Sequence, residues 1–150
     1  VIDANVILDG FTITNGATLG VNGQDGWTDE NGNGTNGEDG ENAYGGGIYC
    51  KNSNLTIRGC TFSNNAVIGG NGGDCGYMNP WDYEHYNGNG GDGGSGYGGG
   101  IYCSNSNLTT IKCKFLNNTV IGGNGGYGEA AGGHGDSLPG DAGIARGGGI

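Results

Sequence analysis

The sequence predicts an all-β protein built as a parallel β-solenoid of about three rungs. The block "GGGIYCKNSNLTIRGCTFSNNAVIGGNGG" at 45–73 returns without a gap at 98–126 as "GGGIYCSNSNLTTIKCKFLNNTVIGGNGG". Within each block, apolar and polar residues alternate over runs of three to five residues, as in half-buried strands. Strands this short need the same strand of the next repeat beside them, which is what a solenoid provides.

Composition points the same way. Of the 150 residues 40 are glycine and only 33% are hydrophobic, which is too little apolar material for a conventional globular core. The repeats fill the chain, and the weaker N-terminal copy "VILDGFTITNGATLG" completes the set. The expected units are 1–44, 45–97 and 98–146, with 147–150 starting the next.

The two full copies contain the short strands in the same order. The segments "GIYC", "NLTI" and "CTF" are separated by Asn, Ser and Gly corners. Equivalent residues are expected to stack at the strand spacing of about 4.8 Å. The expected ladders are Ile48 with Ile101, Ile13 with Phe62 and Phe115, and Asn15 with Asn64 and Asn117.

These motifs resemble a known family of repeats. "LDGFTITNG" and "GGGIYC.NSNLTI..C.F.NN" are similar to the right-handed parallel β-helix repeats of bacterial surface and secreted proteins, in the style of polymorphic outer-membrane proteins and pectin-lyase-like repeat proteins. The resemblance covers the strand blocks, roughly half of the chain. It implies a right-handed helix and an extracellular or cell-surface location. It implies little about activity, because the fold hosts enzymes, adhesins and passive stalks.

The glycine-rich segments depart from that pattern. Glycines recur there at three-residue intervals, as at Gly34, Gly37 and Gly40, which suits polyproline II geometry. One interpretation is three floppy loops. The other is three insertions that run out and back as extended strands and stack into a second, glycine-lined layer. The insertions are residues 21–44, 71–97 and 124–146.

The five cysteines allow two interpretations. Cys50 and Cys60 are equivalent to Cys103 and Cys113, and alternation places all four inward. They are either stacked small hydrophobic residues or one disulfide per rung, Cys50 to Cys60 and Cys103 to Cys113. Cys75 is left over, as a free thiol or as a bond to another chain.

The net charge of −10 argues against nucleic acid and anionic membranes as partners, and no membrane insertion is expected in this segment. No cofactor is expected, with calcium the one ion that the acidic insertions would suit. "DENGNG" resembles the start of an EF-hand loop through Asp29, Asn31 and Asn33, and "GGNGGD" ends on Asp74. The alternative is solvated loop carboxylates.

One aromatic segment, "CGYMNPWDYEHY", stands apart from the repeats. Its rings fit a cluster that folds the loop onto itself, a contact between subunits, or a platform on which surface glycans stack. The residues concerned are Tyr77, Trp81, Tyr83 and Tyr86. Sequons at Asn33, Asn54, Asn107 and Asn117 are either glycan acceptors or corner asparagines.

No catalytic residues are expected, because acids and bases are scarce in the strand blocks. The sequence therefore predicts a structural, non-catalytic extracellular protein. It is expected to be a solenoid section that stacks head to tail with copies of itself into a surface fibre or stalk. The alternative is an adhesin or glycan-binding module. A second alternative is a polysaccharide lyase or hydrolase of pectin-lyase-like fold.

Overall fold

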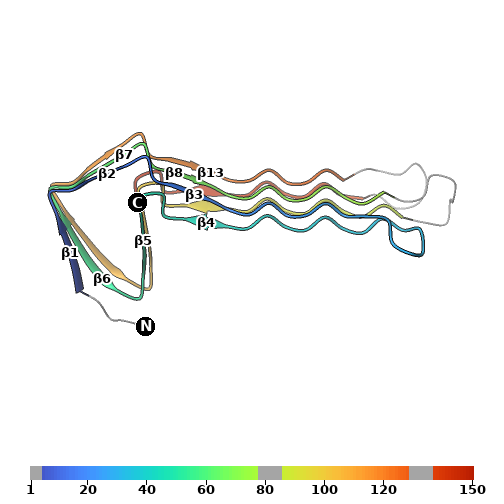
Figure 1. Cartoon of the computed structure of the whole chain (residues 1–150), viewed down its shortest axis with the longest axis horizontal. Coiled ribbons are helices and arrows are strands. Elements are labelled where there is room, and N and C mark those ends of the chain that lie inside the picture. The colour runs from blue at the N-terminus through green and yellow to red at the C-terminus, as the bar shows by residue number, and fades with distance from the viewer. Residues whose placement is uncertain (1–4, 78–85, 129–136) are drawn as a thin grey trace.

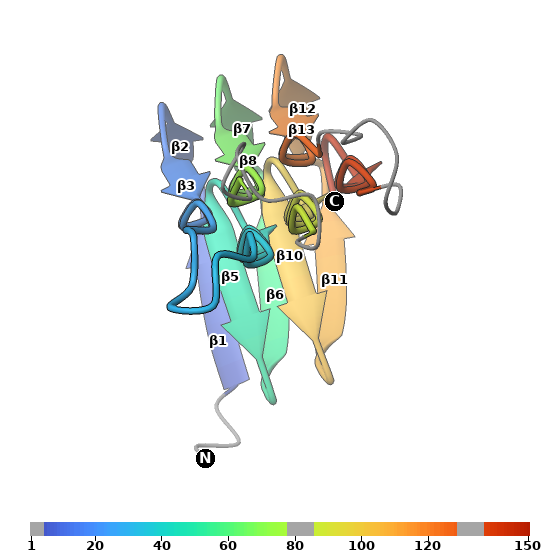
Figure 2. The ribbon, with the colours of Figure 1, turned by 90° about the vertical axis from the view of Figure 1, so that its right-hand side faces the viewer.

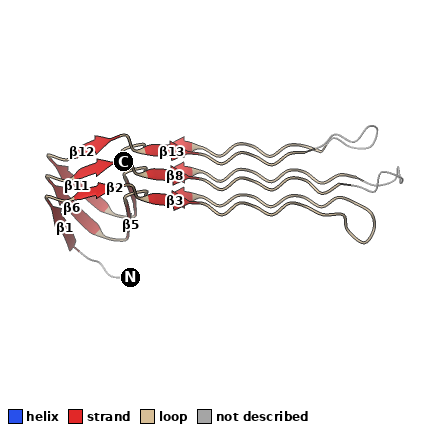
Figure 3. Ribbon diagram, turned by 45° about the horizontal axis from the view of Figure 1, so that its top comes forward, coloured by secondary structure: helices blue, strands red, loops and turns tan. Residues whose placement is uncertain are grey.

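The computed structural model describes residues 5–77, 86–128 and 137–150. It confirms the all-β fold, with parallel strands stacked in register over about three rungs. The solenoid core lies at one end of the molecule, and a long glycine-rich arm projects from each rung (Figures 1 and 3). None of the described residues belongs to a helix of the length and apolarity that a membrane crossing needs.

Each rung places its short strands before and after its arm. The first rung has β1 (Asn5–Asp9), β2 (Thr12–Thr14), β3 (Ala17–Leu19) and, after its arm, β4 (Ala43–Tyr44). The second has β5 (Ile48–Lys51), β6 (Asn54–Arg58), β7 (Thr61–Ser63), β8 (Ala66–Ile68) and, after its arm, β9 (Gly96–Tyr97). The third has β10 (Ile101–Ser104), β11 (Asn107–Ile111), β12 (Lys114–Leu116), β13 (Thr119–Ile121) and, after its arm, β14 (Ala145–Arg146).

Every strand pairs in parallel with its counterpart in the next rung. The sheets run β1-β6-β11, β10-β5, β12-β7-β2, β13-β8-β3 and β14-β9-β4. Figure 2 shows these equivalent strands side by side. The register places Ile101 beside Ile48, and Phe62 between Ile13 and Phe115, as the aligned repeats predict.

The two residues at the corner after β2, β7 and β12, which are Asn-Gly in the first rung and Asn-Asn in the other two, have separate roles. Asn15, Asn64 and Asn117 turn the chain, with φ of 56°, 54° and 52°. Asparagine tolerates this left-handed conformation better than most residues with a side chain. The residue that follows faces the interior: Asn65 is completely buried, and it hydrogen-bonds to Asn118 in the next rung.

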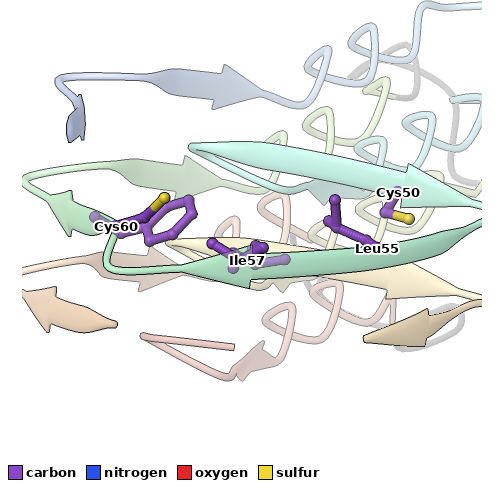
Figure 4. Close-up of a cluster of buried hydrophobic side chains, with 6 residues drawn as sticks. Cys50, Leu55, Ile57 and Cys60 are labelled. Atoms are coloured by element: carbon purple, nitrogen blue, oxygen red, sulfur yellow. The ribbon is translucent and has the colours of Figure 1, made fainter. Parts of the chain in front are cut away.

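The core is a narrow column of inward-facing side chains. Leu55, Ile57, Cys60 and Phe62 from the second rung are buried against one another (Figure 4). The Phe62 ring stacks on the Phe115 ring, with centroids 5.1 Å apart. The second rung has the best-buried core because its strands lie between those of the first and third rungs.

Candidate functional site: the glycine arms and the tyrosine cluster

Each glycine-rich insertion forms an arm with one limb that leaves the core and one that returns to it. The outgoing limbs are residues 20–28, 69–77 and 122–128, and the return limbs are residues 34–42, 86–95 and 137–144. Seen along the arms in Figure 2, the limbs appear as tight three-sided coils packed together. The arms therefore have the stacked, extended arrangement and not that of floppy loops.

Equivalent limbs bond to each other through the backbone from one rung to the next. The Gly23 N–H donates to the Asn71 carbonyl at 2.8 Å, and the Gly72 N–H donates to the Asn124 carbonyl at 2.8 Å. Both bonds recur three residues along each limb. A three-residue repeat is the period of a polyproline II helix.

Outgoing and return limbs are also joined to each other. The Gly73 N–H donates to the Glu38 carbonyl at 2.8 Å, and the Gly91 N–H donates to the Gly73 carbonyl at 2.9 Å. The Gly126 N–H continues the chain of bonds to the Gly91 carbonyl at 2.8 Å. A polyproline II helix has no internal hydrogen bonds, so these contacts between limbs are what satisfy its backbone.

Close backbone contact explains the glycine period. A Cβ at Gly73 would lie less than 3.0 Å from the Gln24 carbonyl oxygen, and one at Gly91 would lie less than 3.0 Å from the Glu38 carbonyl oxygen. Real Cβ atoms essentially never approach other atoms so closely. Glycine at these sites is required by packing and carries no chemistry of its own.

Asp and Asn side chains of the limbs also take part in the pairing between rungs, by accepting backbone N–H groups of the equivalent residues in the next rung. The Asp92 N–H donates to Asp39 Oδ1 at 2.8 Å, and the Asp141 N–H donates to Asp92 Oδ1 at 2.8 Å. The Asn71 N–H is bound in the same way by Asn22 Oδ1 at 2.9 Å. Many of the acidic and amide residues that enrich the insertions therefore bind the next rung.

The two carboxylates expected to suit calcium, Asp29 and Asp74, also accept backbone N–H groups. Asp29 lies in the turn at the tip of the first arm, where its Oδ1 accepts the N–H groups of Asn33 at 2.8 Å and Asn31 at 2.9 Å. These hydrogen bonds, led by the one from Asn33, lower the pKa of the Asp29 carboxyl. Asp74 belongs to another limb, and its carboxylate accepts the Tyr127 N–H. Among the described residues no three acidic, His or Cys side chains gather as a metal site.

Two of the four expected aromatic interaction residues can be placed. Tyr77 and Tyr86 lie towards the outer end of the second arm and are about half exposed. Trp81 and Tyr83 lie outside the described residues. Asn54 and Asn107 carry two of the sequons, and their side-chain amides form an exposed ladder along β6 and β11, joined at 2.8 Å.

A tyrosine cluster, which sequence reasoning missed, lies where the arms meet the core. The Tyr44 and Tyr97 rings are stacked, with centroids 5.2 Å apart, and the Tyr49 and Tyr102 rings are stacked at 5.8 Å. The two pairs meet through Tyr44 and Tyr102, at 4.9 Å. The repeated "GIYC" contained the signal for one pair, and the tyrosine before each of the first two "GGG" runs contained the signal for the other.

Of the two interpretations of the cysteines, the structure does not show the disulfides: all five cysteines are free. Cys50 and Cys60 lie towards opposite ends of the buried cluster along β6 (Figure 4). The rung neighbour of Cys50 is Cys103, its partner in the β5–β10 register. Cys75 is 2% exposed inside the second arm, so its thiol is not presented to another chain.

The free thiols lead to a first testable prediction. Burial, together with the adjacent Cys50, raises the pKa of the Cys103 thiol from 9.0 to about 11. Because the thiolate is the reactive form, we expect alkylation of Cys103 at about pH 8 to be about 100-fold slower than in the unfolded chain. Mass spectrometry of iodoacetamide-treated protein, native and in urea, measures this ratio. Equal rates, or a mass lower by two hydrogens per cysteine pair, would contradict the prediction.

The described residues leave a hollow at each end of the solenoid core. At the first rung a hollow of about 360 Å³ lies among Val6, Leu8, Ile48 and Leu55. At the third rung a hollow of about 350 Å³ lies among Ile101, Leu108 and Ile150 and reaches Tyr97 and Tyr102. Both hollows are lined mainly by residues that would contact a further rung.

Comparison with known proteins gives no relative: no protein-family model, no curated protein and no solved structure matches the chain.

Proposed function

We propose that this chain is a structural, non-catalytic section of an extracellular surface fibre or stalk. Its core would be a right-handed parallel β-helix in the style of polymorphic outer-membrane and pectin-lyase-like repeat proteins. The core joins further rungs head to tail, and the arms project sideways as a stiff rod. The resemblance of the strand blocks to secreted and surface repeats supports the extracellular location.

One observation carries this proposal: residues 147–150 already form the start of a further rung. The Gly99 N–H donates to the Gly147 carbonyl at 2.9 Å, and the Ile101 N–H donates to the Gly149 carbonyl at 3.0 Å. The repeated "GGGI" thus lies on the edge of the third rung in the register of the inner rungs. An open strand edge above an apolar hollow favours the addition of another rung.

Electron microscopy of the purified protein over a range of concentrations tests the proposal. We expect rods that lengthen with concentration and carry lateral projections. Reductant should leave them unchanged, because the cysteines are free. Loss of the rods in chelator would assign calcium a role at the joint. Short isolated particles at every concentration would contradict head-to-tail joining.

A second candidate function is glycan binding, which the tyrosine cluster favours. Tyr49 is 52% exposed and its ring lies beside the rings of Tyr44 and Tyr102. Stacked aromatic faces suit the apolar faces of sugars. If the cluster binds glycans, Tyr49→Ala should abolish glycan-array signals, whereas Tyr127→Ala, an exposed tyrosine elsewhere on the arms, should not. Equal binding by both variants would dismiss this candidate.

A further inference from the structure

The residue type at equivalent limb positions differs between the interior of the arm layer and its two outer faces. The interior positions hold glycine, and the outer faces hold residues with side chains. In the second rung, Gly70, Gly73, Gly91 and Gly94 are buried between limbs. Each would place a Cβ within 3.0 Å of a carbonyl oxygen in the preceding rung. Any limb that has another rung before it therefore needs glycine at these positions.

The first rung has side chains there instead. Four residues of the first rung are equivalent to these glycines, and a fifth, Trp27, continues the same three-residue series. Together they are called the N-face residues: Val21, Gln24, Trp27, Glu38 and Glu41. Trp27 stands where the second rung has Gly76, whose Cβ would meet the Trp27 carbonyl. Val21 is 64% exposed and Trp27 is 63% exposed, so the N-face residues cover the outer side of the first arm.

The opposite face is closed by a different substitution. Gly37 and Gly90 are equivalent to Pro139, and each would place a Cβ within 3.0 Å of the next rung's outgoing limb. Gly93 is equivalent in the same way to Ala142. The C-face residues, Pro139 and Ala142, are exposed on the third rung.

Proline also removes a hydrogen-bond donor. The Gly37 N–H donates to the Asn89 carbonyl, and the Gly90 N–H donates to the Leu138 carbonyl, both at 2.9 Å. The equivalent donor of the third rung would belong to residue 139, which is a proline and has none. Placing proline and bulky or charged side chains on an open edge is how natural proteins prevent edge-to-edge association.

We infer that the arm layer is complete at six limbs: the N-face and C-face residues close it, so the arms of another rung or another copy cannot join it. The hollows at the two ends of the core lie outside these faces and are not covered by the N-face and C-face residues. A fibre of this chain would therefore carry its arms as separate rods, with a joint between copies wider than the joint between rungs. The inference stands on the arm faces alone and does not depend on the proposed function.

The test compares three forms of the full chain by sedimentation velocity and cryo-electron microscopy. The first is the wild type. The second changes every face residue to glycine: V21G, Q24G, W27G, E38G, E41G, P139G and A142G. The third changes the same residues to alanine and leaves Ala142 as it is. Alanine removes the charge and bulk of the faces but keeps the Cβ that blocks close approach.

We expect only the glycine form to associate through its arms, with an apparent mass at least about twice that of the wild type, because its edges become free to pair. The alanine form should sediment like the wild type. Equal association of the glycine and alanine forms, or no association of a glycine form whose arm amides remain protected from exchange, would overturn the inference.

The wild type gives an independent answer if the glycine form fails to fold its arms. Separate arms on rods, or unassociated particles, are expected. A continuous fin of arms at the rung spacing of about 4.8 Å would overturn the inference while supporting the proposed fibre. Unassociated particles would contradict head-to-tail joining and leave arm closure standing, so the two failures are distinguishable.

Discussion

Gly91→Ala is expected to disrupt the packing between the limbs of the first and second arms. Glu38→Ala is expected to leave that packing intact. The two residues hold the same position in successive rungs. At Gly91 the new methyl group would overlap the Glu38 carbonyl, which is backbone and cannot rotate away. At Glu38 the side chain already points off the outer face and is exposed.

Overpacking of this kind costs about 1–3 kcal/mol, and more where the neighbour is rigid. We expect a loss of about 2 kcal/mol in the free energy of local opening for the central limbs, which corresponds to about 30-fold faster amide exchange. Hydrogen-exchange mass spectrometry should show this loss in the limb peptides of the second arm and not in β6. The same loss in Glu38→Ala would contradict the packing explanation.

The second large effect is expected at Asn65. Its side chain is completely buried, and its Oδ1 accepts the Gly16 N–H at 2.9 Å. Its Nδ2 donates to the Ile13 carbonyl at 3.1 Å and to Asn118 Oδ1 at 2.9 Å. This one amide therefore ties the corners of all three rungs together.

Asn65→Leu keeps the branched shape of the side chain and removes these hydrogen-bond partners. Each buried polar group left unpaired costs about 1–3 kcal/mol, so we expect the free energy of unfolding to fall by about 2–5 kcal/mol. Urea denaturation followed by circular dichroism measures the loss.

The matched control is Asn54→Leu, in the same rung. Asn54 is exposed, and among the described residues its side-chain amide bonds to the equivalent asparagines, Asn5 and Asn107. We expect it to cost less than about 1 kcal/mol. Similar losses in the free energy of unfolding at both sites would contradict the prediction, because the buried Asn65 amide would then contribute no more than the exposed Asn54 amide.

The fold could be predicted because the repeats encode the register directly. Once Phe62 is aligned with Phe115, parallel pairing of identical strands follows. Local pattern could not separate the roles of Asn64 and Asn65, since both are asparagines at one corner and only the path of the chain decides which side chain turns inward. The sequence could not decide whether Cys50 and Cys60 are free or joined by a disulfide. Alternation shows which face of a strand each residue lies on, but not how far apart the two residues are along the strands.

The arms show a different limit of sequence reasoning. Glycine at every third residue indicated extended limbs, but the pairing between limbs depends on where each arm turns. Only with the limbs aligned does the contrast between Glu38 and Gly91, or between Gly90 and Pro139, become visible. The tyrosine cluster was missed because Tyr44 and Tyr102 are far apart in sequence and meet only where an arm returns to the core.

The pairing of each arm with the next also decides when each arm can complete its folding during synthesis. The return limb of the first arm donates from Gly37 and Gly40 to Asn89 and Asp92, some fifty residues later. During synthesis at about 5–20 residues per second, this limb waits several seconds for its acceptors to leave the ribosome. The first arm is therefore the first to be synthesised, yet it reaches its final form only after the second arm has emerged.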